Sequence, residues 1–160
     1  MYAVQTKTGS ELACAGFLGR LGYEAKAPEK IMIIRRGGTW LHERKLVFSG
    51  YIFIDSEEIK PEDYYRIKNV SGVINFLGKG SPEKLSEPGR QHINWLWNGG
   101  KPIEPSKIYV TAEGIKSILS GPLRKYRGGY IDYDLRHKRV RIEISVCGVS
   151  KRVTLPAEYV

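Results

Sequence analysis

The sequence predicts an α+β fold over residues 1–100, followed by a small all-β unit. Helical periodicity in the apolar residues occurs only before residue 100, where it alternates with strand patterns. Residues 101–106, KPIEPS, place two prolines among polar neighbours and are typical of a linker. We therefore expect an antiparallel sheet flanked by helices in residues 1–100, a linker at 101–106, and a separate all-β domain in residues 107–160.

The chain opens with a strand pattern, YAVQT, and then a helix pattern within SELACAGFLGRLGY. Ser10 stands where a helix cap is expected. The apolar side chains that recur at helical spacing are Cys14, Phe17, Leu18 and Leu21. These four residues should form the buried face of the helix.

Two β-rich segments, IMIIRR and TWLHER, then flank Gly37-Gly38, which favours a hairpin. GYIFID predicts the next strand, KPEDYYRIKNV a short helix that begins near Pro61, and GVINFLG a further buried strand. SEPGRQHINWLWNGG predicts a weaker last helix that ends at Asn98-Gly99-Gly100. The expected order of elements is β-α-β-β-β-α-β-α.

After the prolines the helical period disappears and five short strands are predicted: KIYVT, IKSILSG, GYIDYD, RVRIEISV and SKRVTL. In the longest, Val140, Ile142, Ile144 and Val146 alternate with polar residues and should face a core. Several short strands at this spacing indicate a small barrel.

The formal net charge of +9 is unevenly distributed along the chain. Residues 1–105 contain 15 basic and 12 acidic residues, whereas residues 106–160 contain 11 basic and 5 acidic residues. A positive field concentrated in the last third favours binding to phosphate backbones over a role in solubility alone.

Other features exclude several classes of protein. No apolar run approaches the roughly 18 residues of a membrane span, and the N-terminus lacks a secretory pattern. Cys14 and Cys147 are isolated, as is typical of reduced packing residues, so we expect a cytoplasmic monomer without a membrane partner. His42, His92 and His137 have no metal-ligand spacing, and no phosphate loop or nucleophile motif is present, so neither a metal, a cofactor nor an enzyme is expected.

The segment LVFSGYIFI, residues 46–54, is apolar on both sides of a predicted strand. Tyr51 and Phe53 should point to one face, and Ile52 and Ile54 to the other. A strand with two apolar faces is either enclosed within its own domain or docked to a partner. The pattern alone leaves both alternatives open.

Two segments resemble motifs of the NusG-type transcription elongation factors. LVFSGYIFI resembles the LFPGYVFV signature of their N-terminal domain, with Ser49 in place of the usual proline. EGIKSILSGPLRKYRGGYI resembles their KOW motif, with Glu113-Gly114 replacing the usual acid. GVINFLG and TKTGSE also match, so the resemblance covers essentially the whole chain. These departures and the basic charge of the KOW segment resemble features of the specialised paralogues of the family, the RfaH and LoaP types. The resemblance is greatest to the LoaP-type antiterminator.

The resemblance implies a KOW barrel in residues 107–160 and two contacts with RNA polymerase. Phe48, Tyr51 and Phe53 would contact the clamp helices, with a core role as the alternative. Tyr64 and Tyr65 would contact the gate loop, with a plain surface helix as the alternative. Holding both sides of the polymerase cleft would suppress pausing and termination without catalysis.

The resemblance also implies contacts with nucleic acid. The hairpin residues that would lie near upstream DNA are Arg35, Arg36, Trp40, Arg44 and Lys45; a solvated hairpin with a locally packed tryptophan is the alternative. The KOW residues that would bind a nascent RNA hairpin are Arg124, Lys125, Tyr126, Arg127, Arg139, Arg141, Lys151 and Arg152. Of these, Tyr126 would stack on a base. A general NusG-like adaptor, whose KOW domain binds a ribosomal protein or Rho, is the alternative function, and a ribosome-associated KOW protein a weaker one.

Overall fold

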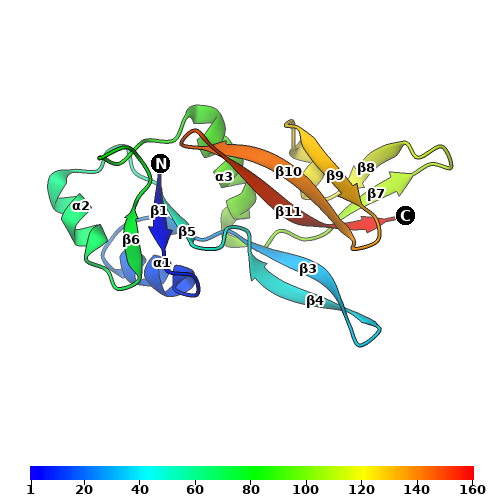
Figure 1. Ribbon diagram of the computed structural model, residues 1–160, viewed down its shortest axis with the longest axis horizontal. Coiled ribbons are helices and arrows are strands. Elements are labelled where there is room, and N and C mark those ends of the chain that lie inside the picture. Colours follow the sequence, from blue (N-terminus) through cyan, green and yellow to red (C-terminus); the bar gives the residue numbers. More distant parts are fainter.

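The computed structural model describes residues 1–160, apart from the side chains of Tyr130 and Ile131. We refer to residues 1–100 as the N-terminal part and to residues 107–160 as the C-terminal part. Figure 1 shows the two parts side by side with α3 between them. The elements of the N-terminal part are β1 (Tyr2–Thr6), α1 (Glu11–Arg20), β2 (Ala25–Lys26), β3 (Glu29–Arg36), β4 (Thr39–Leu46), β5 (Tyr51–Ile54), α2 (Pro61–Lys68), β6 (Val73–Phe76), α3 (Glu87–Trp97) and the 3-10 turn η1 (Asn98–Gly100).

The N-terminal sheet has the strand order β2-β5-β1-β6, with antiparallel pairing throughout. One face packs under α1 and α2, where Ile52 and Ile54 are fully buried. Phe53 points to the opposite face, as the alternation predicted. The β6 strand lies at the sheet edge and leaves Ile74 47% exposed, so the expectation of a buried strand there is wrong.

The α1 helix buries a different face from the expected one. Cys14 and Leu18 are buried, but Phe17 and Leu21 are 46% and 41% exposed. Glu11 takes the remaining buried position because its carboxylate accepts hydrogen bonds from the backbone amides of Gly9 and Gly50, at 2.6 and 2.8 Å. The side chain of Ser10 makes no capping hydrogen bond. Glu11 beside it accepts the hydrogen bonds of the loop amides instead.

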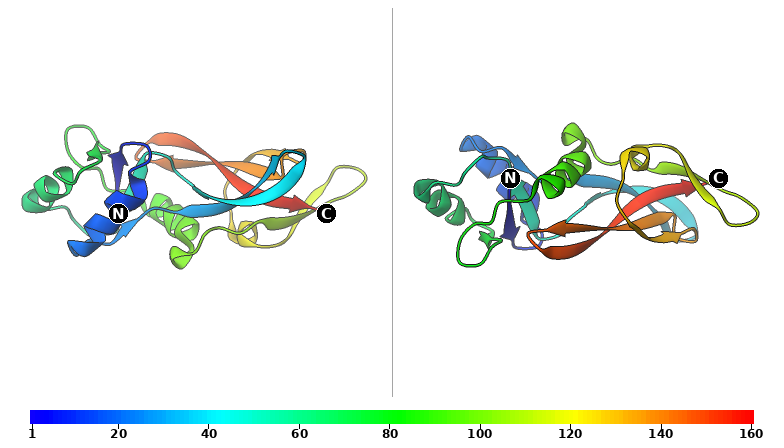
Figure 2. Two further views of the ribbon diagram at one scale, coloured as in Figure 1. Left: turned by 90° about the horizontal axis from the view of Figure 1, so that it is seen from below. Right: turned by 90° about the horizontal axis from the view of Figure 1, so that it is seen from above.

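The β3–β4 hairpin forms where the glycine pair predicted it. Arg36 pairs with Thr39, which leaves Gly37 and Gly38 as a two-residue turn with φ values of 56° and 81°. Glycine adopts such conformations without the steric strain of a residue with a Cβ atom, so a glycine pair suits this turn. The hairpin projects from the N-terminal sheet toward the C-terminal part (Figures 1 and 2).

The C-terminal part forms a five-stranded sheet with the order β8-β7-β11-β10-β9. Its elements are β7 (Ser106–Val110), β8 (Lys116–Ser120), the 3-10 turn η2 (Pro122–Lys125), β9 (Tyr130–Asp134), β10 (Arg139–Val146) and β11 (Val149–Tyr159). All five expected strands are confirmed, and Val140, Ile142, Ile144 and Val146 are all buried. The pairing leaves β8 and β9 as edges, so the sheet is open rather than the closed barrel that was expected.

The two parts share one hydrophobic core. Phe48, Phe53 and Leu96 belong to the same buried cluster as Ile142 and Val153 of the C-terminal sheet. Figure 2 shows α3 between the two sheets from both sides. The sequence predicts two domains joined by a linker; in the structure the two parts pack together because the second apolar face of the N-terminal sheet and the apolar side of α3 need cover.

The segment expected to be a linker, residues 101–106, lies against the hairpin. The amide of Ile103 donates to the Glu29 carbonyl and the amide of Ile31 donates to the Ile103 carbonyl, both at 2.8 Å. Ile103 is 1% exposed and Ser106 already begins β7. No helix in the described part of the chain is long and apolar enough to cross a membrane.

Candidate functional site

The aromatic residues around β5 gather on one face of the N-terminal sheet, as predicted. The rings of Phe48 and Phe53 meet edge to face with their centroids 5.2 Å apart. Phe48 is 7% exposed and Phe53 is 1% exposed, whereas Tyr51 is half-buried. We call these three residues the β5 face. Phe48 and Phe53 lie in one buried cluster with α3 and the C-terminal sheet, so only the Tyr51 edge of the face is open to solvent.

Tyr51 marks the edge of this covered face. The Lys151 ammonium donates a hydrogen bond of 3.1 Å to the Tyr51 hydroxyl and lies 4.2 Å from the centroid of its ring. Lys151 belongs to β11, so a residue expected to bind RNA instead contacts a residue expected to bind polymerase. The contact is at the rim, where water can replace it.

The loop before β5 is held by Glu11. Burial acts to raise the pKa of this carboxyl, but hydrogen bonds from the backbone amides of Gly50, Glu11 and Gly9 bring it below the usual range. Gly50 has a φ of 80°, a conformation that favours glycine. The Ser49-Gly50 turn is thereby fixed and sets the direction in which Tyr51 enters the strand.

A second contact between the two parts is made by α3. The Trp95 and Tyr126 rings stack with centroids 5.2 Å apart and planes 18° apart, and the Trp95 indole donates to the Pro122 carbonyl at 3.1 Å. Tyr126 is 6% exposed, and its hydroxyl donates to the Gly129 carbonyl at 2.9 Å. Burial, followed by the charge of Glu143, raises the pKa of Tyr126. Stacking of Tyr126 on a base would require α3 to move away.

Tyr64 and Tyr65 lie on α2, on the opposite side of the N-terminal sheet from the β5 face. Tyr64 stacks on Phe76 at 5.5 Å and is half-buried, so it packs against its own domain. Tyr65 is 66% exposed. Of the two, Tyr65 alone offers most of its ring to a partner.

Most of the basic residues expected on the hairpin are already paired with acids. Arg36 contacts Glu43 at 2.5 Å, and Arg44 makes a two-pronged contact with Glu29 at 2.8 and 2.9 Å. Lys45 lies 3.9 Å from Glu43. Arg35 has no ion pair among the described residues and lies 5.8 Å from the centroid of the Trp40 ring.

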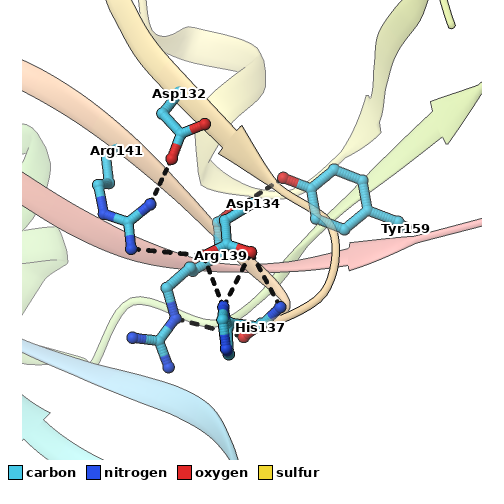
Figure 3. A network of polar contacts seen from close by, with 6 residues as sticks. All are labelled: Asp132, Asp134, His137, Arg139, Arg141 and Tyr159. Atoms are coloured by element: carbon cyan, nitrogen blue, oxygen red, sulfur yellow. Dashed lines mark hydrogen bonds and ion pairs between the residues drawn. The ribbon is translucent and has the colours of Figure 1, made fainter.

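Arg141 is likewise paired, within a network at the β9–β10 turn (Figure 3). It contacts Asp132 closely and Asp134 at 3.4 Å. Burial acts to raise the pKa of Asp134, but hydrogen bonds from the side chain and backbone of His137 and from Arg141 bring it below the usual range. The Tyr159 hydroxyl donates to the Arg139 carbonyl at 2.8 Å, so the turn is held from several sides.

Four other cations of the C-terminal part face solvent. Arg124 donates to the Leu119 carbonyl at 3.0 Å and Arg127 to the Arg124 carbonyl at 2.7 Å, so both guanidinium groups are directed by backbone rather than by acids. Lys125 and Arg152 are exposed. None of these four has an ion pair within the described residues, which leaves their charge available to an anion.

The structure also brings together residues that sequence reasoning did not connect. Lys138, in the turn between β9 and β10, lies with its ammonium 4.4 Å from the centroid of the Trp40 ring. The run RHKR at 136–139 was visible in the sequence, but its position beside the hairpin depends on the packing of the two parts. Across the residues that the structure describes, no three His, Cys, Asp or Glu side chains gather as a metal site.

Known proteins share this chain's sequence pattern. The family described as "Transcription termination factor nusG" matches residues 1–94. The protein "Transcription termination/antitermination protein NusG" of Rickettsia conorii is 31% identical over 124 residues, which cover 76% of this chain and 63% of that protein. Its counterpart in Thermus thermophilus is 26% identical over 172 residues, covering 96% of this chain and 93% of that protein. With more than half of its length matched, the chain belongs to the NusG family.

Proposed function

We propose that this protein is a transcription elongation factor that binds RNA polymerase through the β5 face. The observation that carries the proposal is the position of Phe48, Tyr51 and Phe53 on one face of the sheet, opposite the face that α1 and α2 cover. Aromatic side chains bury much area at low entropic cost, which suits them to a protein interface. The clamp helices of the polymerase are the proposed partner.

Because the C-terminal sheet covers the β5 face, docking requires the two parts to separate first. The affinity measured for polymerase is then the intrinsic affinity reduced by the fraction of open molecules. Tyr65 on α2, exposed on the other side of the sheet, is the proposed contact with the gate loop. The ring of Tyr64 packs against it edge to face. Bridging both sides of the polymerase cleft would suppress pausing and termination, with no catalytic group involved.

The proposal is tested by replacing Tyr51 with alanine in the full chain. Tyr51 is half-buried, so its loss should leave the fold intact, unlike the loss of Phe53 in the core. Phe17→Ala is the matched control, since Phe17 is an aromatic residue that is 46% exposed on α1. Tyr51→Ala should reduce both the retention of purified polymerase and read-through at a terminator, while Phe17→Ala should change neither. Equal retention by both variants would exclude the β5 face.

For the C-terminal part we propose binding to a nascent RNA hairpin, as in a LoaP-type antiterminator. The support comes from Arg124, Lys125, Arg127 and Arg152, which are exposed and form no ion pair with any acid that the structure describes. Neutralising one phosphate-contacting cation should lower the slope of log K against log salt by about 0.7 to 0.9. An arginine that reads a base should instead cost about 1–3 kcal/mol on the cognate RNA alone.

A second candidate is a general adaptor whose C-terminal part holds a ribosomal protein or Rho. The β7–β8 hairpin favours it, because Tyr109, Ile115 and Leu119 are 48%, 63% and 47% exposed. Exposed apolar side chains grouped on one hairpin are typical of a protein interface. Ile115→Ser would abolish such binding and leave RNA binding unchanged, whereas Arg124→Gln would have the opposite effect.

A further inference from the structure

A basic hollow of about 420 Å³ lies between the tip of the β3–β4 hairpin and the β9–β10 turn. Arg35 and Trp40 line it from the N-terminal part, and Arg136, His137 and Arg139 line it from the C-terminal part. Neither part forms the hollow alone. We refer to it below as the basic hollow.

The cations of the basic hollow are not neutralised. Arg35, Arg136 and Arg139 line the hollow, and Lys138 lies beside it against Trp40. None of the four has an ion pair among the described residues, in contrast to the neighbouring Arg36, Arg44 and Arg141. The acid closest to the turn, Asp134, is shared between His137 and Arg141. A cluster of four uncompensated cations raises the local concentration of anions.

Two of these cations lie against the ring of Trp40. The Lys138 ammonium lies 4.4 Å and the Arg35 guanidinium 5.8 Å from the centroid of its ring. Both cations are therefore held at the hollow, so less side-chain entropy is lost when they bind an anion. Lys138 has a φ of 55°, which turns the chain back at this point.

The buried Lys30 has an ammonium group that is influenced by Arg139, one of the residues that line the hollow. Its ammonium donates to the Thr154 carbonyl at 2.7 Å and has no ion pair among the described residues. Burial first, and then the charges of Arg139 and Lys45, lower the pKa of Lys30 to about 8.

We propose that the basic hollow binds the phosphate backbone of a single nucleic-acid strand with cations from both parts of the chain. One strand suffices because three arginines line one hollow of nucleotide size, with Lys138 beside it, rather than an extended groove. Strand binding at the basic hollow goes beyond the proposed function, because it involves the β3–β4 hairpin, requires the two parts to be packed together and needs no polymerase. A ligand held by both parts stabilises their packing, so the strand opposes exposure of the β5 face.

The experiment is a fluorescence anisotropy titration of the full chain with labelled oligouridine and oligodeoxythymidine of about ten nucleotides, at several salt concentrations. Arg35→Gln and Arg136→Gln remove one cation from each part. Arg20→Gln is the matched control, because Arg20 is also exposed and also lies over an aromatic ring, 5.4 Å from the centroid of Phe17. Arg35→Gln and Arg136→Gln should each weaken binding and lower the salt slope by about 0.7, while Arg20→Gln should change neither.

Two results would overturn the proposal. If only one of Arg35→Gln and Arg136→Gln changes the slope, the strand contacts one part of the chain alone. Trp95→Ala does not touch the basic hollow but weakens the packing of the two parts, so it should also lower the affinity for the strand. Unchanged affinity in a Trp95→Ala protein whose parts have separated would contradict a site that both parts share. The oligonucleotide that binds with the higher affinity, oligouridine or oligodeoxythymidine, shows whether the natural ligand of the basic hollow is RNA or DNA.

Discussion

Replacing Trp95 with alanine should loosen the packing between the two parts without disrupting either. The substitution removes the ring stacked on Tyr126 at 5.2 Å and the hydrogen bond to the Pro122 carbonyl at 3.1 Å. An aromatic pair contributes about 0.5–1.5 kcal/mol beyond its buried area, and a hydrogen bond about the same. Together with the apolar area lost from a half-buried side chain, the free energy of unfolding should fall by about 2–3 kcal/mol.

Trp95→Phe separates the two contributions. It keeps a ring against Tyr126 but removes the indole donor, so it should cost about 1 kcal/mol. Urea unfolding gives the free energies, and amide hydrogen exchange gives their location. In Trp95→Ala, exchange should accelerate in α3 and in residues 122–126, while α2, which packs elsewhere, should be unaffected. If Trp95→Ala and Trp95→Phe unfold at the same urea concentration and residues 122–126 keep their protection, this contact does not hold the parts together.

Three further substitutions test the fold around the β5 face and the hairpin. Glu11→Gln should lower the free energy of unfolding by about 1.5–3 kcal/mol at pH 7, because the Gly50 amide loses a charged acceptor. Folding lowers the pKa of Glu11 from 4.5, so the difference between Glu11→Gln and wild type in urea unfolding should shrink as the pH falls below that value. The pKa of Lys30 is lowered from 10.5 to about 8, so the folded protein binds fewer protons between these values and its stability should rise with pH there. Lys30→Met should remove that rise in melting temperature relative to wild type; parallel pH profiles would show that Lys30 is not buried. Tyr51→Phe loses only the hydrogen bond from Lys151 and should cost at most about 1 kcal/mol in chemical denaturation.

The elements that local sequence specifies were predictable. The alternation of Val140, Ile142, Ile144 and Val146 identified both a strand and its buried face, and Gly37-Gly38 identified a two-residue turn. The β2 strand was missed because two residues are too few to show a period. Its pairing with β5 depends on the sheet and not on its own composition.

The faces that other elements cover were harder to predict. Phe17 has the spacing of a buried residue but remains exposed, because it lines a pocket that α1 shares with Arg66 and Val70, while Glu11 is drawn inward by backbone amides. The apolar alternation at Phe53 correctly indicated a face that needs a partner, yet the strand itself does not specify whether that partner is another protein or the C-terminal sheet. The position of Lys138 beside Trp40 follows from the packing of the two parts, which no spacing in the sequence encodes.

The proposed docking of polymerase requires the C-terminal sheet to leave the β5 face first. It is tested by locking the two parts together at the hairpin, away from that face. Trp40→Cys and Lys138→Cys, in a Cys147→Ser background, would be joined by a cleavable thiol-reactive crosslinker, because the two native side chains already meet. Binding of purified RNA polymerase would then be measured on the same protein before and after cleavage. The locked protein should not bind polymerase, and binding should recover once the crosslinker is cleaved; equal binding in both states would show that polymerase does not need the β5 face to be uncovered.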